Sequence, residues 1–184
     1  MNEESIKTEK NRLSPVYDWI QCLVFVLVIC VLMFTFITRV ASVVGSSMEP
    51  TLQNQDLVLA SNLFYTPKQG DIVIFKKESY KDAALVKRII ATEGQTVDID
   101  FDQGIVYVDG QPLKEDYTAE LTYNSLNFTG PQVVPKGCVF VLGDNRNNSL
   151  DSRDSRVGMV DKSLIIGRIY LRIFPISKFG SVYK

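Results

Sequence analysis

The chain has 184 residues, of which 46% are apolar, and its 20 Lys and Arg against 21 Asp and Glu leave a formal net charge of -1. This balance gives no electrostatic reason to expect nucleic acid as a partner, and the length fits one globular domain with an appendage. The absence of histidine excludes Ser–His–Asp and Cys–His nucleophiles and His-ligated metals, so a base working near neutral pH must be a perturbed Lys, Asp, Glu or Cys.

The first predicted element is an apolar segment without charged residues that runs from Trp19 to Thr38. Twenty residues at about 1.5 Å each form roughly 30 Å of helix, which matches the hydrocarbon thickness of a bilayer. A helix of a soluble domain would need a polar face, and this segment has none. We predict a transmembrane helix at 19–38. A cleavable signal peptide is the alternative, although its apolar stretch is normally only about 7–15 residues long.

Basic residues near the two ends of this segment predict its orientation. Lys7, Lys10 and Arg12 precede it, whereas Arg39 follows it and the next basic residue is Lys68. Cytoplasmic flanks carry the excess of Lys and Arg. We therefore predict a cytoplasmic tail at 1–18 and an extracytoplasmic domain at 39–184, which places the protein in the cell membrane with a single pass.

The remainder of the chain has the pattern of short β-strands. The β-rich runs are Asp56–Ala60, Asp71–Lys76, Ala84–Thr92, Thr96–Asp100, Gly104–Val108, Cys138–Leu142 and Leu164–Ile173. Turn-forming residues separate these runs, and the turns on either side of the run that ends at Val108 indicate a meander. The predicted fold is mainly β, with one antiparallel β-sheet domain behind one N-terminal transmembrane helix.

The first candidate for chemistry is the serine pair in Gly45-Ser46-Ser47-Met-Glu-Pro50. Gly45 permits close backbone approach, and Pro50 restricts the residue before it to extended conformations, so the pair lies on a constrained segment. Ser47 follows the apolar segment by nine residues, which keeps its hydroxyl near the membrane surface. The alternative is a polar turn with no chemical role.

The second candidate is Lys87, which lies among bulky apolar residues in the run Ala84–Thr92. Alternation along a strand places Lys87 on one face and Arg88 on the other. Burial disfavours an ammonium ion and lowers the pKa of a lysine, whereas arginine remains protonated. Lys87 is therefore the candidate base. The alternative is an edge strand with two solvated basic residues.

The third candidate is the polar stretch from Gly143 to Arg153, directly after a predicted strand. Its closely spaced Asp, Asn and Ser side chains indicate a hydrogen-bonded loop that supports a site. A calcium loop is the alternative, but Arg146 and Arg153 among the would-be ligands argue against a cation. No metal site is predicted.

Taken in order, these segments resemble the type I signal peptidases. The matching stretches are the apolar segment, Ser47-Met-Glu-Pro-Thr-Leu52, Gly70-Asp-Ile-Val-Ile-Phe75, Lys87-Arg88, the Gly143-Asp-Asn-Arg loop through Ser149-Leu-Asp-Ser-Arg153, and Gly167–Pro175. The short chain and single anchor are most similar to the compact Gram-positive type.

The resemblance implies that Ser47 is the nucleophile, that Lys87 is the base, and that the Ser149 hydroxyl orients Lys87. It implies a supporting set formed by Asp144, Asn145, Ser149, Asp151, Arg153 and Arg88, with Asp151 and Arg153 as an ion pair. Gly45, Ser46, Met48 and Pro50 would lie near the oxyanion and the substrate. Some members carry a serine where this chain has Gly45, so the Ser47 N–H is the expected oxyanion donor and a second donor is left open.

The resemblance also implies the substrate, a secretory preprotein cut after a small residue that has another small residue two positions before it. Preproteins and the lipid bilayer are the expected partners, without a cofactor and without nucleic acid. Two alternatives stay open at this point. One is a self-cleaving repressor-type protease with a Ser–Lys pair, and the other is an anchored β domain that binds a partner without catalysis.

A separate hypothesis concerns the aromatic stretch Leu63-Phe64-Tyr65 in a predicted loop. Apolar side chains of this kind can enter the membrane interface. Packing into the core is the alternative.

Overall fold

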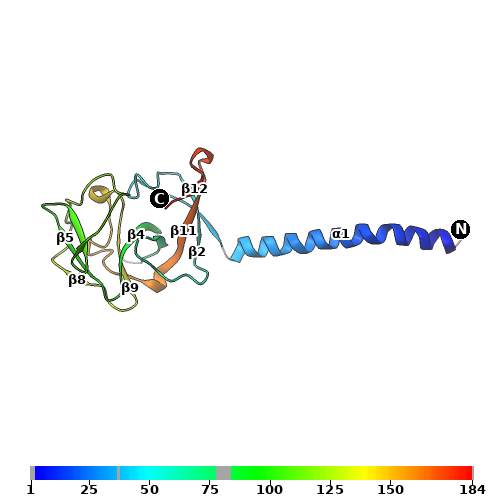
Figure 1. Ribbon diagram of the computed structural model, residues 1–184, viewed down its shortest axis with the longest axis horizontal. Coiled ribbons are helices and arrows are strands. Elements are labelled where there is room, and N and C mark those ends of the chain that lie inside the picture. The colour runs from blue at the N-terminus through cyan, green and yellow to red at the C-terminus, as the bar shows by residue number, and fades with distance from the viewer. Residues whose placement is uncertain (1–2, 37, 78–83, 184) are drawn as a thin grey trace. The chain divides into compact units, whose positions relative to one another are not determined.

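The computed structural model describes residues 3–36, 38–77 and 84–183 (Figure 1). It contains two compact units, residues 1–38 and residues 39–184. The first unit is the helix α1, Glu3–Phe36, and the second is a β domain.

Helix α1 is long and apolar enough to cross a membrane. Its most apolar window, Pro15–Leu32, has a mean hydropathy of 2.1, and none of that window is buried. The helix covers the predicted span as far as Phe36. A signal sequence near the N-terminus has the same properties, so the helix alone does not separate the two interpretations.

The β domain contains one large sheet and one small sheet, and the strand pairs of the described residues are antiparallel. The large sheet has the order β1 (Arg39–Ser42), β2 (Leu57–Ser61), β11 (Ile165–Phe174), β3 (Ile72–Phe75), β4 (Leu85–Thr92), β9 (Cys138–Leu142) and β10 (Val160–Asp161), with β12 (Gly180–Ser181) paired to β11. The small sheet has the order β7 (Gln111–Pro112), β6 (Ile105–Val108), β5 (Thr96–Asp100) and β8 (Gln132–Val133). Three short 3-10 helices are η1 (Arg146–Asn148), η2 (Lys162–Leu164) and η3 (Ile176–Lys178).

The seven predicted strand runs correspond to β2, β3, β4, β5, β6, β9 and β11, each within one residue at either end. The predicted meander is confirmed, because β5, β6 and β7 are successive neighbours in the small sheet. The sequence did not predict β1 or the two-residue strands, since so short a segment carries no measurable periodicity.

Strand β4 lies inside the large sheet, between β3 and β9. Lys87 pairs with Val73 on one side, and Arg88 pairs with Leu142 on the other. Both basic side chains are buried. The alternative of an edge strand with solvated basic residues is therefore wrong.

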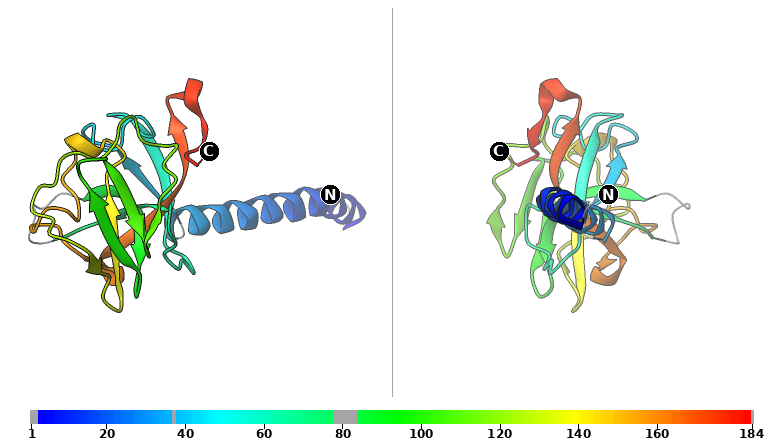
Figure 2. Two further views of the ribbon diagram at one scale, coloured as in Figure 1. Left: turned by 60° about the vertical axis from the view of Figure 1, so that its left-hand side comes forward. Right: turned by 90° about the vertical axis from the view of Figure 1, so that its right-hand side faces the viewer.

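Strand β11 lies between β2 and β3 and joins the part of the large sheet formed by β1 and β2 to the part that begins with β3. Together with η3 and β12 it forms a hairpin that projects from the domain in both views of Figure 2. Residues from β2 and β3, which are near each other in sequence, are thus held together by the last long strand of the chain.

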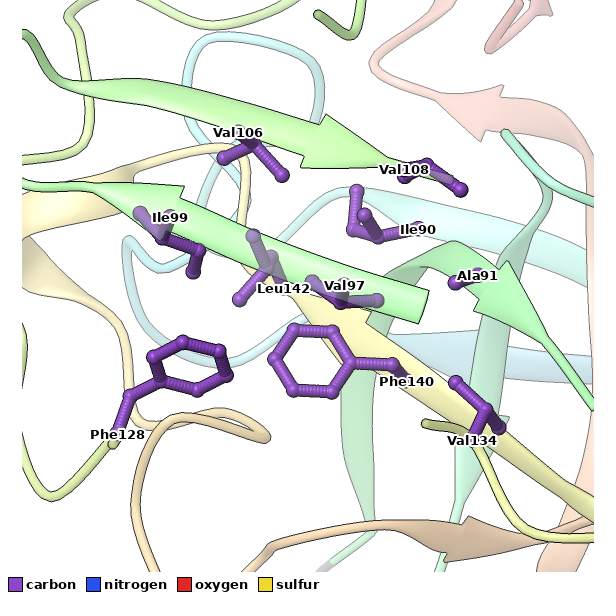
Figure 3. Close-up of a cluster of buried hydrophobic side chains, with 10 residues drawn as sticks. All are labelled: Ile90, Ala91, Val97, Ile99, Val106, Val108, Phe128, Val134, Phe140 and Leu142. Atoms are coloured by element: carbon purple, nitrogen blue, oxygen red, sulfur yellow. The ribbon is translucent and has the colours of Figure 1, made fainter. Parts of the chain in front are cut away.

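A shared hydrophobic core packs the small sheet against the large one (Figure 3). Val97 and Val106 of the small sheet face Ile90, Phe140 and Leu142 of β4 and β9. All of these side chains are fully buried. This packing fixes the small sheet, and the connection between β7 and β8, relative to the strand that carries Lys87.

The two alternatives for the stretch Leu63-Phe64-Tyr65, contact with the membrane and packing into the domain, apply to different residues. Phe64 is 97% exposed, whereas Tyr65 is half-buried and donates a 2.8 Å hydrogen bond to the Asp71 carboxylate. Tyr65 therefore belongs to the structure of the domain, and Phe64 is the exposed aromatic side chain of this stretch.

Candidate active site

Ser47 lies on a turn between β1 and β2 that two buried apolar side chains anchor. Met48 and Leu52 are in the core, and the Leu52 amide donates to the Met48 carbonyl at 2.9 Å. Gly45 has a φ of +91°, a conformation that favours glycine. The half-buried Ser47 is therefore presented on a fixed backbone. Met48, expected near the substrate, has its side chain in the core.

Lys87 and Ser47 meet, although 40 residues separate them in the sequence. The Lys87 Nζ atom lies 2.6 Å from the Ser47 Oγ atom, and Lys87 is 2% exposed. Burial lowers the pKa of Lys87 to about 8, while the Asp151 and Asp144 carboxylates raise it and the Arg153 guanidinium lowers it further. A neutral amine at this distance can accept the serine proton.

Arg88 forms a buried ion pair on the opposite face of β4. Its Nε and Nη2 atoms donate to the two Asp144 oxygens at 2.8 and 2.6 Å, and Asp144 is fully buried. The Thr51 hydroxyl donates to the same carboxylate at 2.5 Å. The Arg88 guanidinium also lies 3.9 Å from the centre of the Tyr117 ring. The pair thus connects β4, the turn after Ser47 and the loop after β9.

The loop after β9 bonds directly to the serine turn. The Asn145 amide donates to the Ser47 carbonyl at 3.0 Å, and the Asn145 Nδ2 donates to the Ser46 carbonyl at 3.1 Å. The Asn148 Nδ2 donates to the Ser46 hydroxyl at 3.1 Å. These bonds fix the position of Ser47 relative to the loop.

A second buried ion pair shapes the same loop. The Arg153 Nε and Nη2 atoms each donate to Asp151 at 2.9 Å, and both side chains are fully buried. Asp151 also accepts the Gly143 amide at 3.0 Å. Because Arg153 occupies the Asp151 carboxylate, the calcium-loop alternative lacks one of its ligands. Within residues 3–36, 38–77 and 84–183, no group of three Asp, Glu, Cys or His is placed to hold a metal.

Ser149 lies next to the site, but the expected hydrogen bond to Lys87 is not made. Its Oγ atom is buried and has no hydrogen-bond partner among the described residues. Ser149 instead packs against Gly143, where a Cβ atom would lie 2.1 Å from the Ser149 Oγ and 2.5 Å from the Ser47 carbonyl oxygen. Only glycine fits at position 143 without a rearrangement.

The second oxyanion donor does not come from position 45. Gly45 has no side chain, and its amide donates to the Asn54 side chain at 3.0 Å. Pro50 is exposed and has no amide proton to donate. The Ser47 N–H thus stays the predicted donor.

Sequence reasoning missed three residues around the site: Thr51, Glu115 and Tyr117. Thr51 lies in the quoted serine motif, so its position could have drawn attention to it. Glu115 and Tyr117 lie in an irregular connection, and no spacing rule relates them to Lys87 or to the loop after β9. Their contacts follow only from the packing of the two sheets.

Comparison with known protein families identifies the family to which this chain is related. The family model described as signal peptidase, peptidase S26, matches residues 16–174. The chain belongs to this family. It is a serine endopeptidase, so the alternative of a β domain without catalysis is wrong.

Several relatives match the chain over most of its length. A probable signal peptidase I-1 of Synechocystis is 38% identical over 89% of this chain and 85% of its own. Signal peptidase I P of Bacillus subtilis subsp. natto is 36% identical over 92% of this chain and 95% of its own. A crystal structure of a signal peptidase I from Enterococcus faecalis aligns with a TM-score of 0.45 at 32% identity, covering 56% of this chain and 97% of that chain.

Proposed function

We propose that this protein is a membrane-anchored signal peptidase that removes signal peptides from secreted preproteins, with Ser47 as nucleophile and Lys87 as general base. The observation that carries the proposal is the 2.6 Å contact between the Ser47 Oγ and an amine that is 2% exposed. Family membership supports the substrate class.

The reaction begins when neutral Lys87 takes the proton of the Ser47 hydroxyl as its oxygen attacks the scissile carbonyl. The Ser47 N–H donates to the oxyanion that forms. The Lys87 ammonium then gives its proton to the leaving amine, which yields an acyl-enzyme on Ser47. Lys87 next takes a proton from the water that attacks the ester, and it gives this proton to the Ser47 oxygen as the ester bond breaks, which releases the carboxylic acid product and restores both side chains.

The buried ion pairs support this chemistry by holding the backbone around Ser47. Arg88 and Asp144 join β4 to the loop after β9, and Asp151 and Arg153 set the shape of that loop. Ser149 belongs to the same loop but packs against Gly143, and it makes no hydrogen bond to Lys87. Preorganised positions of this kind are needed for transfer between two fixed atoms.

The location of the substrate explains why such an enzyme has an anchor. A signal peptide leaves its cleavage site at the outer surface of the membrane. We propose that 19–38 spans the bilayer with residues 1–18 in the cytoplasm, and that Ser47, nine residues further on, stays close to that surface. Protease added outside intact cells should digest the domain and leave an N-terminal tag protected, whereas the opposite pattern would reverse the orientation.

Cleavage of a preprotein in detergent by the full-length chain tests the function. Wild type should release the signal peptide, and Ser47→Ala and Lys87→Ala should abolish cleavage with unchanged circular dichroism. Lys87→Arg should also be inactive, because arginine stays protonated. Exposed Ser155→Ala and Lys136→Ala serve as matched controls and should remain active. Near-normal turnover by Lys87→Ala would disprove the base assignment.

Three further measurements address other classes of mechanism. A serine-reactive probe should label Ser47 in wild type and nothing in Ser47→Ala. A chelator should leave the rate unchanged, and inactivation that added metal reverses would indicate a metalloenzyme instead. The self-cleaving repressor-type alternative predicts loss of intact enzyme over time without cleavage of a preprotein.

A further inference from the structure

The connection between β7 and β8 bonds extensively to the loop after β9. Asn147 accepts the amides of Tyr123 and Asn124 at 3.0 and 3.1 Å, and its Nδ2 donates to the Leu121 carbonyl at 3.0 Å. Arg153 donates to the Asn124 carbonyl at 2.7 Å. We call residues 114–127 the clamp segment. It belongs to the small-sheet side of the domain but contacts the loop that holds Ser47.

Glu115 of the clamp segment pairs with a buried arginine of that loop. Arg146 is 1% exposed, and its Nη1 and Nη2 atoms donate to the Glu115 carboxylate at 2.6 and 2.5 Å. Its Nε donates to the Gly143 carbonyl at 3.0 Å. Gly143 in turn packs against the Ser47 carbonyl oxygen. Two residues, Arg146 and Gly143, therefore connect Glu115 to the backbone of Ser47.

Tyr117 acts on the other side, at the strand that carries Lys87. Its ring lies 3.9 Å from the Arg88 guanidinium, and its hydroxyl donates to Glu115 at 3.0 Å. The ring also forms part of the wall of a cavity of about 570 Å³ that reaches Arg88 and Thr51. Stacking on the ring and the bond to Asp144 together fix the Arg88 side chain.

We propose that Tyr117 and Glu115 are positioning residues for the reaction assigned above, and that they act through Arg88 and Arg146 on the geometry of Ser47 and Lys87. This inference rests on the proposed function. Neither residue touches the reacting atoms. They keep two buried guanidinium groups in place. Arg88 then stays paired with the Asp144 carboxylate, and Arg146 holds the loop after β9 against Ser47.

The charged groups that act on Lys87 are Asp151, Asp144 and Arg153. The Asp144 carboxylate raises the pKa of Lys87. Loss of the Tyr117 ring would admit water to Arg88 and weaken its hold on Asp144. The negative charge of Asp144 would then act more strongly on Lys87, and Lys87 would need a higher pH to become neutral.

The test is preprotein cleavage by the full-length chain as a function of pH. Tyr117→Leu should lower kcat roughly 10- to 100-fold with little change in KM, and should move the acid limb of the pH profile to higher pH. Tyr117→Phe keeps the ring and should retain most of the rate and the wild-type acid limb. Tyr170→Leu is the matched control, because it also removes a tyrosine ring that lies over an arginine, Arg168. This variant should change neither kcat nor the acid limb of the pH profile.

Glu115→Gln tests the other half of the proposal. It should lower kcat at unchanged KM, because Arg146 loses its ion pair while the side chain keeps its shape. Equal losses in Tyr117→Phe and Tyr117→Leu, or a loss in Tyr117→Leu without movement of the acid limb, would overturn the positioning role. A wild-type enzyme that cleaves no preprotein would instead overturn the proposed function.

Discussion

Arg88 and Asp144 form a fully buried, two-bond ion pair one residue along β4 from Lys87, on the face that Lys87 does not occupy. The structure thus keeps a charged arginine and a lysine of lowered pKa as neighbours in one strand. Burial lowers the pKa of Lys87, whose nearest partner is a serine hydroxyl, whereas Arg88 has a carboxylate within 3 Å.

Removing the negative charge of this pair should have two separable effects. Asp144→Asn leaves Arg88 buried without its counterion, and it should destabilise the fold by about 3–5 kcal/mol. It also removes a carboxylate that raises the pKa of Lys87, so the acid limb of the pH profile should move to lower pH. Thermal unfolding and the pH profile measure the two effects. Exposed Asp98→Asn should change neither, and an upward move of the acid limb would contradict the assignment.

Cleavage should rise with pH through about pH 8. Burial lowers the pKa of Lys87 to about 8, and only the neutral amine accepts the serine proton. Below this pH, kcat/KM should fall about tenfold per unit. A rate that stays constant down to pH 6 would show that another group is the base.

The same lysine should reduce stability at neutral pH. Between pH 8 and 10.5 the folded chain has lost the Lys87 proton while the unfolded chain keeps it, so the contribution of Lys87 to stability rises with pH across this window. Lys87→Met should be inactive but more stable at pH 7 by roughly 1–3 kcal/mol, as thermal unfolding in detergent can measure. A lower melting temperature for Lys87→Met would contradict this expectation.

Gly143→Ala should impair catalysis through steric crowding. The added Cβ would lie 2.5 Å from the Ser47 carbonyl oxygen and 2.1 Å from the Ser149 hydroxyl, so the loop and the serine turn must separate. We expect roughly a 100-fold loss of kcat and about 1–3 kcal/mol of destabilisation. Gly110→Ala is the control: its φ is +74° and no atom lies within 4 Å, so it should lose some stability but no activity. Equal kinetic losses in the two variants would remove the steric explanation.

Phe64 should contribute to membrane binding by the β domain. Its side chain is 97% exposed on the loop after β2. Phe64→Ser should weaken the binding of a fragment from Ala41 onward to vesicles by roughly tenfold. Exposed Val133→Ser in the small sheet is the control and should bind as wild type. Unchanged binding by Phe64→Ser would exclude the contact.

The strands were predicted from the sequence more accurately than the side-chain contacts were. Short runs of β-branched and other apolar residues located β4 and β9, and both faces of each strand are buried. The nearness of Ser47 and Lys87 followed only from the family resemblance, since no local rule relates residues 40 positions apart. The clamp segment has neither periodicity nor a motif, and its role depends on how two sheets pack.

At Ser149 the family resemblance identified the residue but not the contact that its side chain makes. The family resemblance implied a hydrogen bond from its hydroxyl to Lys87, yet in the structure the hydroxyl lies against Gly143 without a partner among the described residues. A change of side-chain rotamer moves a serine hydroxyl by roughly 2 Å, which is enough to make or break a hydrogen bond. Sequence comparison identifies the residue but does not set that torsion.

The position of β11 in the large sheet determines when the sheet can be completed during synthesis of the chain. Ser47 belongs to the half of the sheet that contains β1 and β2, and Lys87 belongs to the half that contains β3 and β4; β11, residues 165–174, is the strand between them. A growing polypeptide that has released Ser47 and Lys87 still lacks this bridge. A chain that ends before residue 165 therefore lacks the strand that holds the Ser47 half of the sheet beside the Lys87 half.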